Sequence, residues 1–207
     1  MTRLQPSKIV CIGRNYAKHA AELGSEVPSE PLIFLKPPSS IIYDGDAIVI
    51  PSWAGRVDFE AEIGVVIARR TRHVSEADAW DYISGLVPVN DVTARDLQAA
   101  DGQWTRAKGF DTFCPVGTPI PLEDIDRAAL SVTTRVNGEM RQDGPASDMV
   151  FDIPTIVSHI SRVMTLEAGD LIATGTPDGI GPLSPGDEVV IEVRGVGSVT
   201  NPVVAGD

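Results

Sequence analysis

Three acidic residues recur at every second position of one otherwise apolar segment, residues 57–67. They are Asp58, Glu60 and Glu62. Because the side chains of a β-strand alternate between its two faces, a strand here would point all three carboxylates the same way, with neighbours about 6.5 Å apart. Carboxylates at this spacing can converge on one cation, and crowding them beside the apolar run that follows costs stability unless a cation or protons compensate. Taken alone, the row fits a metal site and an edge strand that displays acids to solvent equally well.

A second acidic position favours the metal site. Asp91 follows an apolar strand-like run, residues 86–89, and so lies at a strand end, where sites are commonly built. Glu60, Glu62 and Asp91 would form an all-oxygen ligand set, which suits a hard cation such as Mg²⁺ or Mn²⁺ and leaves positions for water and substrate. Zinc is less favoured, because no histidine or cysteine lies near these acids in the sequence.

His19 and Glu22 are candidates for proton transfer. They are three residues apart on an expected helix and therefore share one face. A carboxylate beside an imidazole orients the ring and raises its basicity, which makes a general base. From the spacing alone, an ordinary solvated helix with a Lys18–Glu22 ion pair is the preferred interpretation.

The elements that must position these residues are mostly strands. We expect strands over residues 8–13, 32–35, 47–50, 59–68, 86–89, 130–136, 170–173 and 188–193, and helices over 15–23, 75–82, 94–99 and 152–164. Asn137-Gly138 predicts a hairpin turn. Helices and strands do not alternate regularly, which disfavours a parallel α/β fold and favours a mixed, β-rich α+β fold. A length of 207 residues fits one domain, residues 1–207.

Charge and hydropathy exclude several classes of function. The net charge is −12 and no basic run is present, so nucleic acid is not an expected partner. No apolar run approaches the roughly 20 residues of a transmembrane helix, and the N-terminus lacks the apolar stretch of a signal peptide. We therefore expect no membrane association and a cytoplasmic location. Cys11 and Cys114 form no metal or redox motif and are interpreted as small buried side chains.

Seven motifs, in order from about Lys8 to about Asn201, together resemble the fumarylacetoacetate hydrolase family, and more narrowly its short acylpyruvate hydrolase and oxaloacetate decarboxylase branch. The motifs are Arg14-Asn-Tyr-x-x-His19, Phe34-Leu-Lys-Pro37, Asp58-x-Glu-x-Glu-x-Gly64, Asn90-Asp-Val-Thr-Ala-Arg-Asp96, Ala107-Lys-Gly-Phe-Asp111, Val136-Asn-Gly-Glu139 and Thr174-Gly-Thr-Pro-Asp-Gly-Ile-Gly-Pro182.

The resemblance implies a β-roll-like core, a homodimer and a catalytic Mg²⁺ or Mn²⁺. By motif position it makes Glu60, Glu62 and Asp91 the metal ligands and leaves Asp58 as a supporting acid outside the ligand set. It implies that His19 and Glu22 activate water from a mobile segment, and that Lys108 neutralises a developing oxyanion or enolate. The positions that it assigns to substrate binding are Arg14, Tyr16, Lys36, Gln98 and Thr176.

The expected function follows from this resemblance. It is a divalent-metal-dependent cleavage of small 2-oxo acids: hydrolysis of acylpyruvates such as acetylpyruvate or fumarylpyruvate to pyruvate and an acid, decarboxylation of oxaloacetate through an enolate, or both. An isomerase or decarboxylase of 2-hydroxydienoates is an alternative within the family. A non-catalytic binding protein on the same scaffold is the alternative from another class. A dehydrogenase is disfavoured, because no G-x-G-x-x-G motif opens a helix after a strand.

Overall fold

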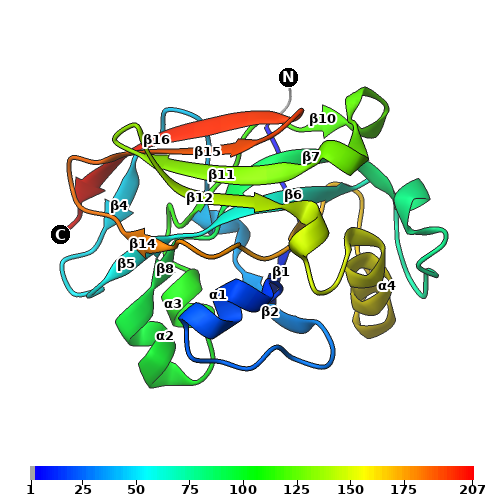
Figure 1. Ribbon diagram of the computed structural model, residues 1–207, viewed down its shortest axis with the longest axis horizontal. Coiled ribbons are helices and arrows are strands. Elements are labelled where there is room, and N and C mark those ends of the chain that lie inside the picture. Colours follow the sequence, from blue (N-terminus) through cyan, green and yellow to red (C-terminus); the bar gives the residue numbers. More distant parts are fainter. Residues whose placement is uncertain (1–2) are drawn as a thin grey trace.

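Six strands form a mixed β-sheet through the middle of the computed structural model, which describes residues 3–207 (Figure 1). Their order is β10-β7-β6-β13-β1-β2, in which β1 and β13 run parallel and the other neighbours are antiparallel. The strands are β1 (Ile9–Gly13), β2 (Leu32–Lys36), β6 (Ala61–Ile67), β7 (Ile83–Asn90), β10 (Ile120–Pro121) and β13 (Leu171–Ala173). All of β6 is buried; apart from Glu62 its residues are apolar or glycine, which allows this burial.

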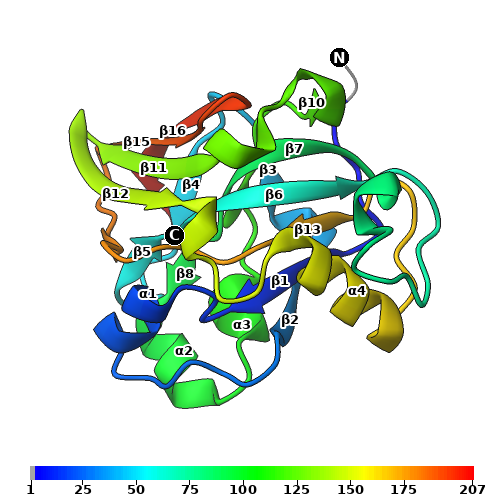
Figure 2. The same cartoon turned by 45° about the vertical axis from the view of Figure 1, so that its right-hand side comes forward.

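A second sheet of five strands packs over the first (Figures 1 and 2). Its order is β12-β11-β15-β16-β4, antiparallel except for the parallel pair β16–β4. The strands are β4 (Ile48–Ile50), β11 (Ser131–Val136), β12 (Glu139–Pro145), β15 (Glu188–Val193) and β16 (Gly197–Ala205). Asn137 and Gly138, with φ of 52° and 81°, make the predicted tight turn between β11 and β12.

The apolar core lies mainly between the two sheets. Ile63 and Val65 of β6 enter it from one side, and Val189 and Ile191 of β15 enter it from the other. This alternation is what buries one face of each strand. A smaller apolar cluster covers the opposite face of the six-stranded sheet and contains both cysteines. Burial raises the pKa of Cys114 to about 12, which agrees with the prediction that the cysteines are small buried side chains.

Three short helices gather at one end of the molecule, and a longer one lies at the other end (Figures 1 and 2). The short helices are α1 (Ala17–Glu22), α2 (Arg95–Asp101) and α3 (Thr105–Lys108). Beside them is a small sheet with the order β14-β5-β8, formed by Gly181–Pro182, Val57–Phe59 and Thr93–Ala94. The longer helix α4 (Ile153–Val163) begins at Asp152, whose side chain accepts a hydrogen bond of 2.9 Å from the amide of Thr155. None of the helices within residues 3–207 combines the length and hydropathy needed to cross a bilayer.

Short elements complete the described chain. The strands β3 (Ile41–Ile42) and β9 (Cys114–Pro115) pair in parallel. Single turns of 3₁₀ helix occupy Pro38–Ser40, Ala79–Tyr82, Leu122–Asp124, Arg127–Ala129 and Ala146–Asp148.

The predicted α+β fold class is confirmed, but away from the acidic row one expected helix is wrong and one strand was missed. The expected helix over residues 75–82 is a turn followed by one turn of 3₁₀ helix. Its backbone hydrogen bonds join residues three apart, and the Ser75 hydroxyl bonds locally to Asp78, so no α-helical turn forms. The strand β16 was missed, because Pro202 argues against a strand that pairs on both sides. The alternating buried residues Val199, Asn201 and Val203 carried the signal.

Candidate active site

The acidic row of the sequence does not lie on one continuous strand. The chain leaves β5 after Phe59 and enters β6, in another sheet, at Ala61, so Glu60 lies at the junction. The side chain of Asn90 accepts a hydrogen bond of 2.9 Å from the amide of Glu60, and the amide of Asp91 donates to the Glu60 carbonyl at 2.8 Å. The expected unbroken strand over residues 59–68 is therefore wrong, because these hydrogen bonds hold Glu60 between two sheets.

The break nevertheless brings three acids together. Glu60, Glu62 and Asp91, called here the carboxylate triad, each offer an oxygen within 4.8 Å of the others. All three are buried, with at most 4% of the residue exposed. Their convergence agrees with the sequence expectation.

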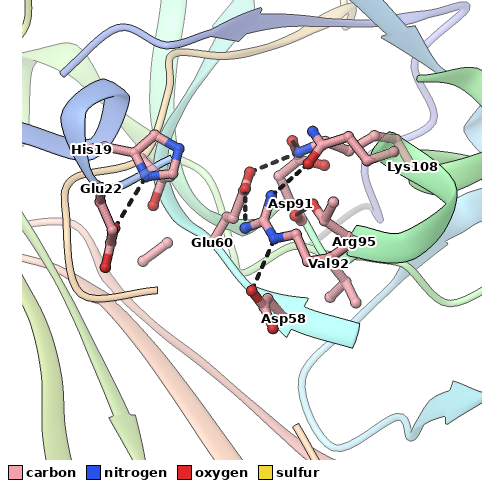
Figure 3. Close-up of polar contacts among 12 residues, drawn as sticks. His19, Glu22, Asp58, Glu60, Asp91, Val92, Arg95 and Lys108 are labelled. Atoms are coloured by element: carbon pink, nitrogen blue, oxygen red, sulfur yellow. Dashed lines mark hydrogen bonds and ion pairs between the residues drawn. The ribbon is translucent and has the colours of Figure 1, made fainter. Parts of the chain in front are cut away.

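Basic side chains surround two members of the triad (Figure 3). Lys108, at the end of α3, donates to Glu60 at 2.7 Å and to Asp91 at 2.6 Å. Arg95, the first residue of α2, donates to Glu60 at 2.5 Å. Lys36, at the end of β2, donates to Asp91 at 2.6 Å. Glu60 and Asp91 thus have cationic partners on the protein itself.

Glu62 is in a different position. Burial raises its pKa well above the usual value, and the charges of Asp91 and Glu60 raise it further, whereas the amide of Gly175 donates only one hydrogen bond, at 2.8 Å. For Glu60, burial acts in the same direction, but Lys108 and Arg95 together hold its pKa well below the usual value. Within residues 3–207, no cationic side chain contacts Glu62. Three buried carboxylates, one of them without such a partner, form an oxygen donor set that fits a divalent cation.

Asp58 lies outside the triad. It is fully buried and accepts from Arg56 at 2.7 Å and 3.1 Å and from Arg95 at 2.8 Å. Arg95 therefore spans Asp58 and Glu60 with one guanidinium group. This geometry agrees with the interpretation of Asp58 as a supporting acid.

His19 and Glu22 of α1 lie on the other side of the site (Figure 3). The distance from His19 Nδ1 to Glu22 Oε2 is 3.5 Å, and His19 is buried. Both carboxylate oxygens of Glu22 also lie 3.3 Å from the amide nitrogen of Gly179, which ties α1 to the loop before β14. The predicted pair is thus formed, with the carboxylate held from two sides.

A cavity of about 540 Å³ joins these groups. It contains the carboxylate triad, Lys108 and the His19–Glu22 pair, together with three of the predicted substrate-binding residues, Arg14, Gln98 and Thr176. Gln98 accepts from Arg95 at 2.9 Å, and the Thr176 hydroxyl accepts from Gln142 at 2.8 Å. The Arg14 guanidinium lies 5.8 Å from the ring centre of Trp104.

Two predicted substrate-binding residues do not line this cavity. The amino group of Lys36 is engaged by Asp91 and by the Val92 carbonyl, and the residue is 1% exposed. Tyr16 is 2% exposed, and its hydroxyl is buried. The geometry therefore does not support direct substrate contact by either residue; Lys36 contacts Asp91 from behind the cavity wall, and Tyr16 is buried.

Sequence reasoning missed Arg56, Arg95 and Gln142. Arg95 is part of the Asn90–Asp96 motif, so its proximity to Asp91 offered a signal. Arg56 is only two residues from Asp58, but nothing in the sequence says that its side chain turns back to that acid. Gln142 accepts from the Ala61 amide at 3.0 Å and from Thr134 at 2.8 Å, and such a long-range link has no local signature.

The chain belongs to the fumarylacetoacetate hydrolase family: the family model described as fumarylacetoacetate (FAA) hydrolase C-terminal matches residues 8–204. The human protein named oxaloacetate tautomerase FAHD1, mitochondrial, is 45% identical over 197 residues, which cover 93% of this chain and 89% of that protein. Protein Rv2993c of Mycobacterium tuberculosis is 52% identical over 200 residues, which cover 96% and 76%.

Solved structures of similar sequence share the fold of this chain. The 2-hydroxyhepta-2,4-diene-1,7-dioate isomerase from Mycobacterium marinum superposes with a TM-score of 0.89 at 48% identity, covering 98% of this chain and 76% of that one. The 5-carboxymethyl-2-hydroxymuconate delta-isomerase from Mycobacterium smegmatis gives 0.91 at 46% identity, covering 99% and 81%. The predicted family is therefore confirmed. Acylpyruvate hydrolysis, the choice between Mg²⁺ and Mn²⁺, the homodimer and the cytoplasmic location stay predictions.

Proposed function

We propose that the protein is a divalent-metal-dependent enzyme that acts on small 2-oxo acids of the oxaloacetate type through an enolate. One observation carries this proposal: a single cavity brings together the carboxylate triad, the Lys108 ammonium and the His19–Glu22 pair. The names of the relatives support it, since one is an oxaloacetate tautomerase and two solved neighbours are isomerases. Tautomerisation, isomerisation and decarboxylation of such acids all pass through an enol or enolate.

Each group has a role in this chemistry. Glu60, Glu62 and Asp91 would hold Mg²⁺ or Mn²⁺, which when bound supplies Lewis-acid polarisation of the 2-oxo group. Lys108 places a buried positive charge beside the same carboxylates, where it stabilises negative charge on the enolate oxygen. His19, oriented by Glu22, transfers the proton at C3.

The proton balance differs between the two reactions. In tautomerisation the C2 hydroxyl proton leaves while C3 gains a proton. In decarboxylation the C3–C4 bond breaks and CO₂ leaves. The electron pair of that bond stays on C3 and forms the enolate, which then takes a proton at C3. We assign the carboxylate next to the 2-oxo group to Thr176, Gln98 and Arg14. Lys36, which contacts Asp91, and the buried Tyr16 have supporting roles.

Hydrolysis of acylpyruvates is the second candidate, and the His19–Glu22 pair favours it. His19 would then deprotonate a water molecule that attacks the distal carbonyl, and cleavage of the carbon–carbon bond would release pyruvate as its enolate. The same pair could therefore serve either reaction. A homodimer and a cytoplasmic location complete the proposal, with neither nucleic acid nor membrane as a partner.

The test is an assay of oxaloacetate tautomerisation and decarboxylation, and of pyruvate release from acetylpyruvate, with Mg²⁺, with Mn²⁺ and with EDTA. We expect turnover that requires metal and is lost in Glu60→Ala. His19→Ala should abolish acylpyruvate cleavage and spare part of the decarboxylation, because loss of CO₂ does not need an activated water. Metal-independent turnover, or full activity of Glu60→Ala, would refute the proposal. Metal binding without turnover of any of these substrates would favour a non-catalytic binding protein.

A further inference from the structure

Arg56 is a charged cavity residue to which the proposed chemistry gives no role. It lines the same cavity as the carboxylate triad, and 53% of its side chain is exposed, so it stands where the cavity opens to solvent. Nε and Nη2 of its guanidinium donate to the two oxygens of the fully buried Asp58. Among residues 3–207, no side chain or carbonyl accepts from its Nη1. An arginine held in this way keeps a directed donor free for an anion.

The backbone of Arg56 is fixed as well. Its carbonyl accepts from the amide of Arg95 at 2.7 Å, and its amide donates to Asp96 at 3.2 Å. The preceding Gly55 has a φ of 70°, and a Cβ there would lie 2.2 Å from an Asp96 oxygen, so glycine is required for this close approach. Arg56 is thus placed by its neighbours before any ligand arrives, which reduces the entropy lost on binding.

Arg56 is also connected to the metal-ligand candidates. The contacts run from Arg56 through Asp58 to Arg95, and from Arg95 to Glu60. The carboxylate of Asp58 therefore holds two guanidinium groups side by side, and these three groups together carry one net positive charge. Arg56 and the triad line one cavity, so a ligand anchored at the triad by one end has its other end in the space that Arg56 borders.

The charge balance of the site specifies the kind of ligand. Four cationic side chains and five carboxylates line the cavity, and Lys36 contacts one of those carboxylates from behind. With a divalent cation at the triad, the positive charges exceed the negative charges by two. A dianion neutralises this excess, whereas a monoanion leaves one positive charge uncompensated.

We propose that Arg56 is a specificity-determining residue that binds the second carboxylate of a 2-oxo dicarboxylate, with Asp58 as the residue that positions it. The inference rests on the proposed function, because it assumes that the 2-oxo end of the ligand is bound at the carboxylate triad.

Binding of unreacted ligands to the Mg²⁺-loaded protein tests this inference. Calorimetry compares 2-oxoglutarate with 2-oxopentanoate, which has the same carbon chain without the second carboxylate. We expect the wild-type protein to bind the dicarboxylate roughly tenfold more tightly or better. Arg56→Gln should reduce this preference to within about twofold by weakening the dicarboxylate alone, and Arg56→Lys should restore part of it.

Matched variants separate the possible causes. Arg70→Gln removes an arginine whose side chain is 74% exposed and whose partner is Glu167 at 3.6 Å, outside the cavity, and it should keep the wild-type preference. Arg14→Gln should weaken both ligands in similar proportion. Circular dichroism confirms that each variant is folded.

Several results would overturn the inference. It fails if Arg56→Gln weakens both ligands equally or leaves the preference intact, or if Arg14→Gln alone removes the preference. It also fails, with the proposed function intact, if the wild-type protein binds both ligands equally well. If the wild-type protein binds neither ligand, the inference is overturned, and metal-dependent turnover of oxaloacetate then decides separately whether the proposed function stands.

Discussion

The molecule buries acidic side chains in two places, and their surroundings are opposite in character. Asp170, just before β13, is 0% exposed and receives five hydrogen-bond donors. The amide and hydroxyl of Ser7, the amide and ammonium of Lys8, and the amide of Glu167 all point at its two oxygens. Burial tends to raise the pKa of Asp170, but these donors hold it below the usual value. This carboxylate is fully compensated by the protein.

The carboxylate triad is not compensated in the same way. Three acids lie within reach of one another, and Glu62 contacts one backbone amide and none of the cationic side chains that neutralise its neighbours. Burying charge without a partner is costly, so a fold keeps such a cluster only when something else uses it. The contrast teaches that a structural carboxylate differs from a candidate metal ligand in how many hydrogen-bond donors and cationic side chains contact it, and not in how many acids lie nearby.

The largest expected effect is on activity at the triad. Glu62→Gln keeps the shape of the side chain but removes a metal-ligand charge, and we expect the turnover of oxaloacetate to fall roughly 10³-fold or more. Glu76→Gln, which changes an exposed glutamate, should leave turnover unchanged. In EDTA, Glu62→Gln should be at least as stable as the wild-type protein, because it removes an uncompensated charge. Wild-type turnover in Glu62→Gln would show that this carboxylate is only structural.

The same amide substitution at the other acid should act on stability. In Asp170→Asn the new amide group faces the donors of Lys8 or Glu167, so we expect the free energy of unfolding to fall by about 2–4 kcal/mol in urea titrations. Glu167→Gln is the control, since its exposed pair with Arg70 at 3.6 Å contributes at most about 1 kcal/mol. A loss below about 0.5 kcal/mol in Asp170→Asn would mean that the five donors find other partners.

Metal ions should separate the two clusters directly. Mg²⁺ at about 100 times its dissociation constant should raise the free energy of unfolding of the wild-type protein by about 2.7 kcal/mol relative to EDTA. Asp170→Asn should keep this increment, and Glu62→Gln should lose most of it. An equal increment in all three proteins would place the metal elsewhere, and no increment in the wild-type protein would remove the metal from the proposal.

Much of the site could be predicted from the sequence, because its signals are local. Glu60 and Glu62 are two residues apart, and His19 and Glu22 are three apart, so the spacing suggests that the members of each pair lie near one another. The spacing alone did not favour a functional site over a solvated surface; Asp91 and the family motifs did. The motifs then supplied Lys108 and Thr176, which periodicity could not. The fold class followed from strand-rich patterning with irregularly placed helices.

The rest depends on contacts between distant segments. The break at Glu60 is made by the Asn90 side chain, thirty residues away, and the role of Asp58 depends on where Arg95 folds back. The donors of Asp170 come from Ser7 and Lys8 at the other end of the chain. The pattern of one segment cannot predict which hydrogen-bond donors a distant segment places beside it. These donors are what distinguish the two acidic clusters.

The smallest expected effect, and the most direct test of that distinction, is the dependence of stability on pH in EDTA. Because the folded pKa of Asp170 is lowered, its stabilisation is present above the unfolded value of about 3.9 and is lost as the pH falls through the folded pKa. The folded pKa of Glu62 is raised, so the wild-type protein should lose stability relative to Glu62→Gln as the pH rises above the unfolded value of about 4.3.

Urea titrations of the wild-type protein and both variants between about pH 3 and about pH 8 measure these differences. The difference in the free energy of unfolding between the wild-type protein and Asp170→Asn should shrink as the pH falls. The difference between the wild-type protein and Glu62→Gln should grow as the pH rises, with the variant the more stable. If the wild-type protein is more stable than both variants, the charge of Glu62, like that of Asp170, is compensated within the protein. The comparison between the two clusters would then no longer hold. Opposite signs of the two differences would show that a buried carboxylate stabilises the fold at Asp170 and destabilises it at Glu62.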